Sequence, residues 1–300
     1  MTEIRRVGVV GCGLMGAGIA EVCARADVPV TVVERYAEAA RAGRLRVLRS
    51  LDRAAANGRI DAARRDRAAD LITVVDEIEA LHEHDLVIEA VAEDERLKVD
   101  VFTRLDSVVT DDRTILATNT SSIPVIRLAA ATTRPDRVVG VHFFNPVPVL
   151  RLVELVPSLL TSPATAQRAE EFVTGTLGKE VVRTRDKAGF VVNALLVPYL
   201  LAAVRMVESG SATVEDVDRG MVLGCAHPLG PLALTDLIGL DTTRAIAESL
   251  YAEFREPQYS PPPLLSRMVE AGLLGRKSGR GFHAYDGQPG REAPVPAGRP

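Results

Sequence analysis

The stretch RVGVVGCGLMGAGIA, residues 6–20, decides the fold. Its apolar run Arg6–Val10 is typical of a buried strand, and Met15–Arg25 has the apolar spacing of a helix. Between them, Gly11–Gly16 follows the pattern GxGxxG. In this strand–turn–helix context the pattern indicates a site for a dinucleotide.

Each glycine of this motif has its own physical role. Gly11 allows the tight turn, Gly13 lets the backbone approach a pyrophosphate, and Gly16 lets the helix pack closely on the strand. The N-terminus of the helix supplies N–H groups and a partial positive charge. The contacts with the dinucleotide are therefore expected from Gly11, Gly13, Leu14, Met15 and Gly16.

The end of the next strand indicates which dinucleotide binds. Glu34 ends the expected strand Val28–Glu34, where a carboxylate accepts hydrogen bonds from ribose hydroxyls and repels a 2′-phosphate. We therefore expect NAD. Arg35 follows directly and could pair with a 2′-phosphate, so NADP stays open as the less favoured cofactor.

Strand-like runs alternate with helical patterns through roughly the first 185 residues. This alternation predicts an α/β fold with a Rossmann-like, doubly wound, mostly parallel sheet. The expected strands are Arg6–Val10, Val28–Glu34, Leu86–Glu89, Thr114–Thr118, Val138–His142, Leu150–Val156 and Glu180–Thr184. The expected helices among them are Met15–Arg25, Ala37–Ala56, Glu95–Val109 and Pro163–Thr176.

After Lys187 the pattern becomes wholly helical. The expected helices are Phe190–Glu208, Val214–Leu223, Leu232–Ile238, Asp241–Phe254 and Pro263–Glu270. We predict an NAD-binding domain over residues 1–187 with a helical arm at about 36–70, an all-α domain over 188–286, and a disordered tail rich in Pro and Gly over 287–300. The first helix of the second domain is apolar nearly all round, so it should be covered by the other domain or a second subunit.

Composition and charge exclude several classes of function. The net charge is −4 and there is no lysine run, which argues against a nucleic-acid partner. The most apolar stretch, Gly189–Val207, is interrupted by Asn193 and Pro198, so we expect a buried helix and no membrane span. Three cysteines without a CxxC pair, and an N-terminus that enters a strand at once, predict a cytoplasmic protein. A chain of this length needs no metal to fold, and none is expected.

Polar residues stand where packing alone would favour apolar ones. Glu154 is flanked by Val153 and Leu155, and a carboxylate buried in such a strand needs a partner. His142, twelve residues earlier, is a plausible one, because a carboxylate orients an imidazole and raises its basicity as a general base requires.

Two further polar residues could hold a substrate oxygen. Ser121 lies in a polar segment just after a strand, and Asn193 lies in an apolar helix. Each has an ordinary alternative: Ser121 could cap the helix that starts near Pro124, and Asn193 could make an interhelical hydrogen bond. Considered together with His142 and Glu154, the four residues favour a catalytic site.

These segments resemble the short-chain L-3-hydroxyacyl-CoA dehydrogenases, most closely the bacterial 3-hydroxybutyryl-CoA dehydrogenase type. The resemblance runs from about Arg6 to Tyr285. It rests on VGVVGCGLMGAGIA, NTSSI, HFFNPVPVLRLVELV, GFVVNALLVPYLLAAVRMVESG, HPLGPLALTDLIGLDTT and GRKSGRGF.

The resemblance implies a role for each matching residue. His142 matches the catalytic base, Glu154 its partner, and Ser121 and Asn193 the groups that hold the substrate oxygen. The resemblance also implies a homodimer formed through the C-terminal helices. The further residues expected to contact the cofactor are Glu93, Lys98, Asn119, Ser121, Asn145 and Lys277.

The helical arm departs from the family pattern. Members of the family grip CoA with a serine and a lysine on this arm. Ser50 matches the serine, but Asn57 stands in the place of the lysine, and Arg53, one helical turn back, could substitute for it.

The expected reaction is therefore the reversible NAD-dependent oxidation of (S)-3-hydroxybutyryl-CoA to acetoacetyl-CoA. One alternative is the same chemistry on a carrier-protein-bound hydroxyacyl group or a small hydroxy acid. A more distant alternative is a non-catalytic NAD-binding structural or sensor protein.

Overall fold

The computed structural model describes residues 3–285, which divide into two compact units between Phe190 and Val191. The division falls three residues after Lys187, where the sequence places the boundary. Residues 287–300, predicted to form a disordered tail, lie outside the described part of the chain.

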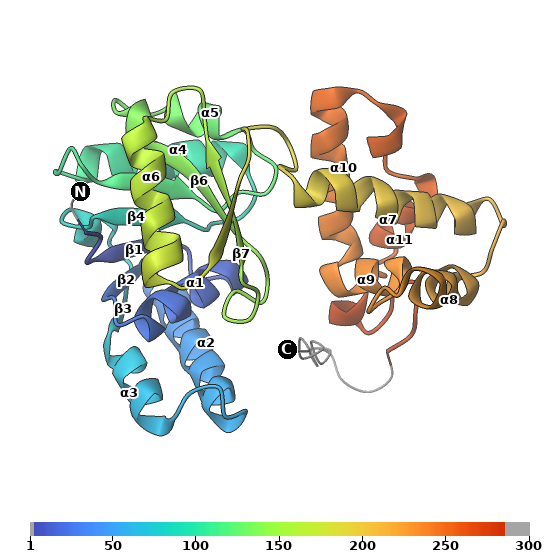
Figure 1. The fold of residues 1–300 in the computed structure, drawn as a ribbon, viewed down its shortest axis with the longest axis horizontal. Helices are drawn as coiled ribbons and strands as arrows, with labels where there is room; N and C mark the ends of the chain where they lie inside the picture. The colour runs from blue at the N-terminus through green and yellow to red at the C-terminus, as the bar shows by residue number, and fades with distance from the viewer. Residues whose placement is uncertain (1–2, 286–300) are drawn as a thin grey trace. The chain divides into compact units, whose positions relative to one another are not determined.

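The first unit is built on one eight-stranded sheet in the order β3-β2-β1-β4-β5-β6-β7-β8 (Figure 1). Strands β1 to β6 pair in parallel, β7 runs antiparallel to β6, and β8 is parallel to β7. The predicted mostly parallel, doubly wound sheet is confirmed. The strands are β1 (Val7–Val10), β2 (Val30–Val33), β3 (Ile72–Val75), β4 (Leu86–Glu89), β5 (Ile115–Thr118), β6 (Val138–Phe143), β7 (Leu152–Pro157) and β8 (Glu180–Arg183).

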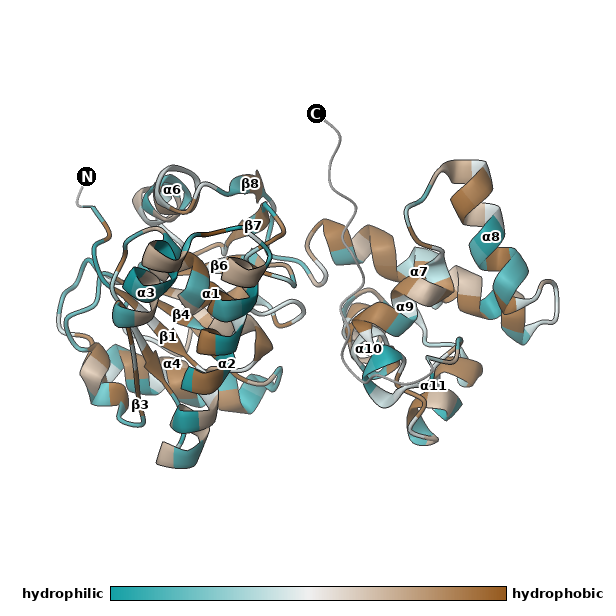
Figure 2. Ribbon diagram, turned by 90° about the horizontal axis from the view of Figure 1, so that it is seen from below, coloured by the Kyte–Doolittle hydropathy of each residue, from teal (hydrophilic) through white to brown (hydrophobic). Residues whose placement is uncertain are grey.

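Helices cover both faces of this sheet and divide its apolar core into two clusters. Side chains from α1 and α2 pack on one face, as Ile19 and Leu51 do. Side chains from α4 and α5 pack on the other, as Phe102 and Leu128 do. Figure 2 shows the mostly apolar strands between helices that carry polar residues outward. The helices are α1 (Leu14–Arg25), α2 (Ala37–Ala56), α3 (Ala62–Asp70), α4 (Glu95–Val108), α5 (Val125–Ala129) and α6 (Pro163–Glu171), which continues as the π-helical turn Phe172–Thr176.

Three local features differ from the sequence-based expectation. The edge strand β3, with the four residues ITVV, was not predicted. Helix α3 falls within the expected arm but was not predicted as a separate helix, because it has few apolar residues. The helix expected from Phe190 begins at Val192, because Phe190 has a positive φ of 48° that an α-helix does not allow.

The second unit is helical. Helix α7 buries Leu200, Leu201 and Val204 but leaves Leu195 and Met206 exposed at 72% and 47%. No helix in residues 3–285 is both long and apolar enough to cross a membrane. The helices are α7 (Val192–Glu208), α8 (Val214–Cys225), α9 (Pro231–Ile238), α10 (Leu240–Phe254) and α11 (Pro263–Glu270).

Candidate active site and dinucleotide site

The turn between β1 and α1 has the geometry that the glycine motif predicts. Gly11 has a φ of +92°, and a Cβ atom on Gly16 would lie 1.8 Å from the carbonyl oxygen of Gly11. A Cβ atom on Gly13 would meet no protein atom within 4 Å. The space above Gly13 is therefore open to a ligand, whereas Gly16 is required by the fold itself.

Helix α1 presents its N-terminus to this open space. Its N-cap residue is Gly13, which offers no side chain to the first N–H groups, and the first turn contains no acidic residue. Unsatisfied N–H groups and the positive end of the helix dipole favour an anion. The turn therefore fits a pyrophosphate.

Glu34 stands beside this turn and anchors it. Its Oε1 accepts a hydrogen bond from the Cys12 N–H at 2.6 Å, and its Oε2 accepts one from the Arg35 N–H at 3.2 Å. Burial, followed by the charge of Glu34, raises the pKa of the Cys12 thiol to about 12, so Cys12 stays protonated and serves as a small packing side chain.

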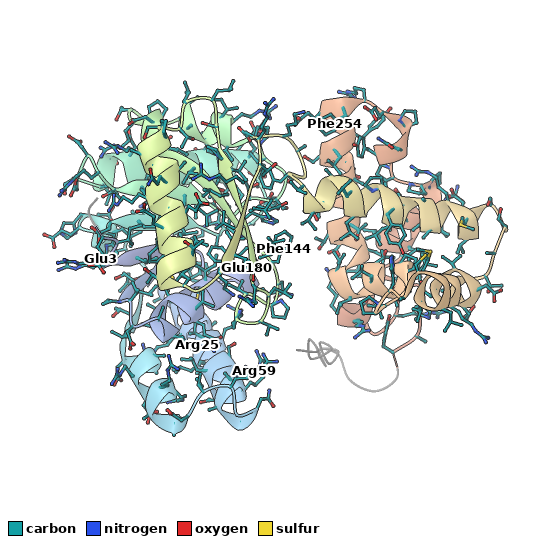
Figure 3. The ribbon with its side chains drawn as sticks, viewed as in Figure 1. Glu3, Arg25, Arg59, Phe144, Glu180 and Phe254 are labelled. Atoms are coloured by element: carbon teal, nitrogen blue, oxygen red, sulfur yellow. The ribbon has the colours of Figure 1, made fainter. Side chains whose placement is uncertain are left out.

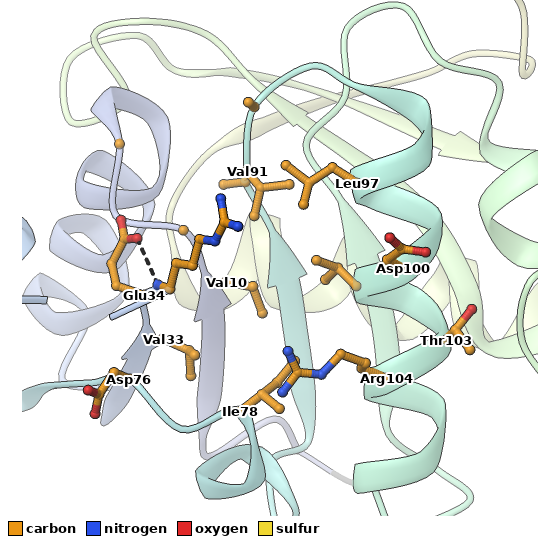
Figure 4. Close-up of a pocket in the computed structure, with 16 residues that line it drawn as sticks. Val10, Val33, Glu34, Asp76, Ile78, Val91, Leu97, Asp100, Thr103 and Arg104 are labelled. Atoms are coloured by element: carbon orange, nitrogen blue, oxygen red, sulfur yellow. Dashed lines mark hydrogen bonds between the residues drawn. The ribbon is translucent and has the colours of Figure 1, made fainter. Parts of the chain in front are cut away.

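A cavity of about 760 Å³ extends from the glycine turn past Glu34 (Figure 4). Its walls include the apolar residues Val10, Ile78 and Val91, and Arg35 also lines it. An apolar cavity with a carboxylate at its edge suits an adenosine group. The turn, Glu34 and the cavity thus fit the dinucleotide that the sequence predicts.

Glu93 organises the polar segment that follows β5. Its Oε1 accepts hydrogen bonds from the Thr120 hydroxyl at 2.6 Å, the Ser121 N–H at 2.9 Å and the Ser122 hydroxyl at 2.8 Å. Burial raises the pKa of the Glu93 carboxyl, but the Lys98 charge and these hydrogen bonds outweigh it, so the net pKa lies below its usual value. Glu93 is therefore ionised and holds Ser121 in place.

Lys98 is buried, which the sequence did not reveal. Its Nζ donates to Glu89 at 2.6 Å and lies 3.3 Å from Glu93. Glu89 ends β4 and also accepts from the Thr118 hydroxyl at 2.7 Å. Sequence reasoning missed Glu89, although an acid at the end of the apolar strand LVIE is the same signal that drew attention to Glu154.

His142 and Glu154 face each other across an antiparallel strand pair. They are register partners of β6 and β7, and the His142 Nδ1 lies 2.8 Å from the Glu154 Oε2. His142 is 6% exposed and Glu154 is fully buried. The rings of Phe144 and Phe190 lie 4.6 and 5.6 Å from the His142 ring, centroid to centroid. The expected histidine–carboxylate contact is thus present in the structure.

Ser121 does not cap a helix. The N-cap residue of α5 is Pro124, and the Asp186 carboxylate accepts from the N–H groups of Val125 and Ile126, both at 2.8 Å. Burial of Asp186 raises its pKa more than these hydrogen bonds lower it. The Ser121 hydroxyl instead lies 3.4 Å from Glu93.

The ends of β5 and β6 are tied together at the same edge of the sheet. Asn119 accepts a hydrogen bond from the Phe143 N–H at 2.9 Å. This contact places the segment with Ser121 beside the strand that carries His142. Asn145 is exposed, two residues beyond β6.

The other predicted site residues lie on the arm and in the second unit. Ser50 and Arg53 are on α2, and Asn57 is its C-cap. Asn193 lies in the first turn of α7. The Lys277 Nζ contacts both carboxylate oxygens of Asp241, at 2.5 and 2.6 Å, within the second unit. The roles of all these residues toward ligands stay predictions.

Comparison with known proteins identifies the family along nearly the whole chain. The model of the 3-hydroxyacyl-CoA dehydrogenase NAD binding domain matches residues 6–187, and that of the C-terminal domain matches residues 189–285. The 3-hydroxybutyryl-CoA dehydrogenase of Mycobacterium tuberculosis is 60% identical over 282 residues, which are 94% of this chain and 99% of that protein.

Solved structures agree with this match. The crystal structure of M. tuberculosis FadB2 has a TM-score of 0.94 at 59% identity, covering 95% of this chain and 100% of that one. The (S)-3-hydroxybutyryl-CoA dehydrogenase PaaH1 from Ralstonia eutropha has a TM-score of 0.89 at 44% identity, with the same coverage. The chain therefore belongs to the 3-hydroxyacyl-CoA dehydrogenase family and is an NAD-dependent dehydrogenase.

Proposed function

We propose that this enzyme catalyses the reversible oxidation of (S)-3-hydroxybutyryl-CoA to acetoacetyl-CoA with NAD. The observation that carries the proposal is the buried 2.8 Å contact between His142 and Glu154. The strands β6 and β7 that carry this pair belong to the same sheet as β1, which leads into the dinucleotide turn. Relatives named 3-hydroxybutyryl-CoA dehydrogenase, at 60% and 42% identity, support the choice of substrate.

In this proposal His142 is the general base. Donation of the Nδ1 proton to Glu154 fixes the tautomer, so that Nε2 carries the lone pair that accepts the hydroxyl proton of the substrate. The nicotinamide of NAD supplies the hydride acceptor. In the reverse direction the protonated His142 returns this proton to the carbonyl oxygen, and Glu154 stabilises the imidazolium.

The substrate oxygen is held by Ser121 and Asn193 in this proposal. Glu93 supports the role of Ser121, because it fixes the backbone on both sides of that hydroxyl. Ser50 and Arg53 on the arm, next to Asn57, bind the CoA end. In this proposal NAD is contacted by the glycine turn and by Glu34, Glu93, Lys98, Asn119, Asn145 and Lys277.

We infer a homodimer formed through the second unit. The exposed apolar residues of its helices support this arrangement, among them Leu195 on α7 and Leu223 on α8, which are 72% and 71% exposed. Removal of such surface from water is the main driving force of association. A cytoplasmic location is inferred from the three free cysteines, two of them buried.

The decisive experiment follows the absorbance of NADH while acetoacetyl-CoA is added to the purified protein, with NADPH in a parallel sample. Rapid loss of NADH alone is expected, because Glu34 repels a 2′-phosphate. Faster loss of NADPH would overturn the assignment of NAD and point to Arg35. Loss of neither would overturn the CoA thioester as substrate, and acetoacetyl-carrier protein is then the next substrate to assay.

A further inference from the structure

The cavity that extends from the glycine turn past Glu34, the dinucleotide cavity, contains charge that the glycine motif does not explain. Charged side chains such as Glu3, Arg59 and Glu180, which Figure 3 labels, are exposed and do not line this cavity. The charged residues that line it are Glu34, Arg35, Asp76, Asp100 and Arg104. Because Glu34 is assigned to the ribose, the acidic residues Asp76 and Asp100 are left without a role.

Asp76 stands beside Glu34 at the same edge of the sheet. Val33 and Val75 are register partners at the ends of the parallel strands β2 and β3, and the Glu34 N–H donates to the Val75 carbonyl oxygen at 2.9 Å. Neighbouring strands lie about 4.8 Å apart, so the backbone of Asp76 is adjacent to that of Glu34. In Figure 4 both residues lie on one side of the cavity, and Asp100 lies on the other.

The Asp76 carboxylate is available to a ligand. Within residues 3–285 it forms no hydrogen bond or ion pair with another group of the protein. Arg104, a cation that lines the same cavity, lies 3.8 Å from Glu79 instead. Asp76 is exposed, so both of its carboxylate oxygens can accept hydrogen bonds from a bound cofactor.

Apolar side chains flank Asp76 in the cavity wall. Val33 and Ile78 both line the cavity and are each only 4% exposed. A flat base fits walls of this kind, with a few polar groups to fix its orientation. Adenine that is attached to ribose has a single hydrogen-bond donor, its 6-amino group, and an unpaired carboxylate is the acceptor that complements it.

We propose that Asp76 accepts a hydrogen bond from the 6-amino group of the adenine of NAD and thereby selects this base. Glu34 and Asp76 divide the adenosine between them, because Glu34 binds the ribose and Asp76 binds the base. Such a site rejects a base with an oxygen in the same place, since two acceptors then face each other. The inference rests on the proposed ribose contact of Glu34, but not on the identity of the hydroxyacyl substrate.

The test compares NADH with deamino-NADH, in which an oxygen replaces the 6-amino group. Calorimetry without substrate measures the affinity for each, and the native protein should bind NADH roughly tenfold more tightly. In Asp76→Asn this preference should fall to near parity, because an amide can either accept from the amino group or donate to the oxygen. Asp76→Ala should also lose the preference, through weaker binding of NADH.

Glu77→Gln is the matched control. Glu77 is the next residue in the chain, is also exposed and does not line the cavity. Its replacement removes the same charge from the same surface and should leave both affinities as they are. The melting temperature of Asp76→Asn should equal that of the native protein, because the substitution breaks no contact within the described residues.

Three results would overturn the inference. Equal affinity of the native protein for the two cofactors would exclude a contact with the amino group. Loss of both affinities by the same factor in Asp76→Asn would indicate a general effect of charge. A preference that falls in Asp100→Asn but not in Asp76→Asn would assign the amino group to α4 instead.

Glu34→Gln separates this inference from the proposed ribose contact. It should weaken NADH and deamino-NADH by the same factor, because the two cofactors carry the same ribose. If Glu34→Gln has this effect and Asp76→Asn keeps the native preference, only the role of Asp76 is wrong. If Glu34→Gln weakens neither cofactor, the ribose does not lie at Glu34, and the assignment of the base to Asp76 is wrong with it.

Discussion

The Lys98 ammonium lies 2.6 Å from the Glu89 carboxylate inside the first unit, where neither side chain is more than 1% exposed. The Glu89 carboxylate also accepts the Val91 N–H at 2.7 Å and the Thr118 hydroxyl. A charge that is taken out of water is stable only with such partners. This pair therefore links the end of β4 to α4, beside the segment that Glu93 holds.

Replacement of Lys98 by Met should strongly destabilise the fold, because it leaves the buried Glu89 carboxyl group without its main partner. The expected loss in the free energy of unfolding is about 3–5 kcal/mol, measured by urea denaturation. The double variant Lys98→Met/Glu89→Gln should recover part of that loss, since both charges are gone. A loss below about 1 kcal/mol in the single variant would show that the pair is not a stabilising contact.

The two glycines of the dinucleotide turn should separate binding from folding. A Cβ atom on Gly16 would lie 1.8 Å from the Gly11 carbonyl oxygen, so Gly16→Ala should lower the melting temperature as well as NADH affinity. A Cβ atom on Gly13 has no protein neighbour within 4 Å, so Gly13→Ala should keep the melting temperature and weaken NADH binding alone. Calorimetry and NADH fluorescence titration measure the two effects. NADH affinity unchanged in Gly13→Ala would contradict a pyrophosphate at this position.

Glu93 should make the fold sensitive to acid. Its folded-state pKa lies below the ordinary value of 4.5, so the stability it contributes is present above that value and is lost as the pH falls toward the folded-state pKa. Urea denaturation at decreasing pH should therefore show a flatter decline for Glu93→Gln than for the native protein. Glu95→Gln, two residues later in the first turn of α4, is the control. Parallel curves for the native protein and Glu93→Gln would contradict the lowered pKa.

The sequence predicted the contact between His142 and Glu154 because an acid between Val153 and Leu155 has few ways to be buried. The pairing needed only two strands in antiparallel register, which a short loop allows. The fold was predictable for the same reason, since apolar strands alternate with amphipathic helices. Local patterns of this kind depend on neighbours in the chain.

Contacts that depend on distant segments were not predictable. Lys98 was expected to contact the cofactor, and only the packing of α4 against the end of β4 shows that it is buried. Helix α5 is capped by Asp186, about 60 residues away in the chain, and not by a nearby serine.

His142 and Glu154 should act as one catalytic unit. His142→Gln removes the general base and should lower kcat roughly 10²–10⁴-fold, whereas NADH binding should persist because His142 does not line the dinucleotide cavity. Glu154→Gln should also lower kcat, because a neutral amide neither fixes the His142 tautomer as firmly nor stabilises the imidazolium. Steady-state rates with acetoacetyl-CoA, and fluorescence titration with NADH, separate the two quantities.

The double variant His142→Gln/Glu154→Gln tests whether Glu154 acts through His142. If it does, the double variant should be no slower than His142→Gln alone, since nothing remains for the second residue to orient. Independent roles would instead multiply the two losses. Turnover that is unchanged in His142→Gln would exclude His142 as the base, and multiplied losses would exclude Glu154 as its positioning partner.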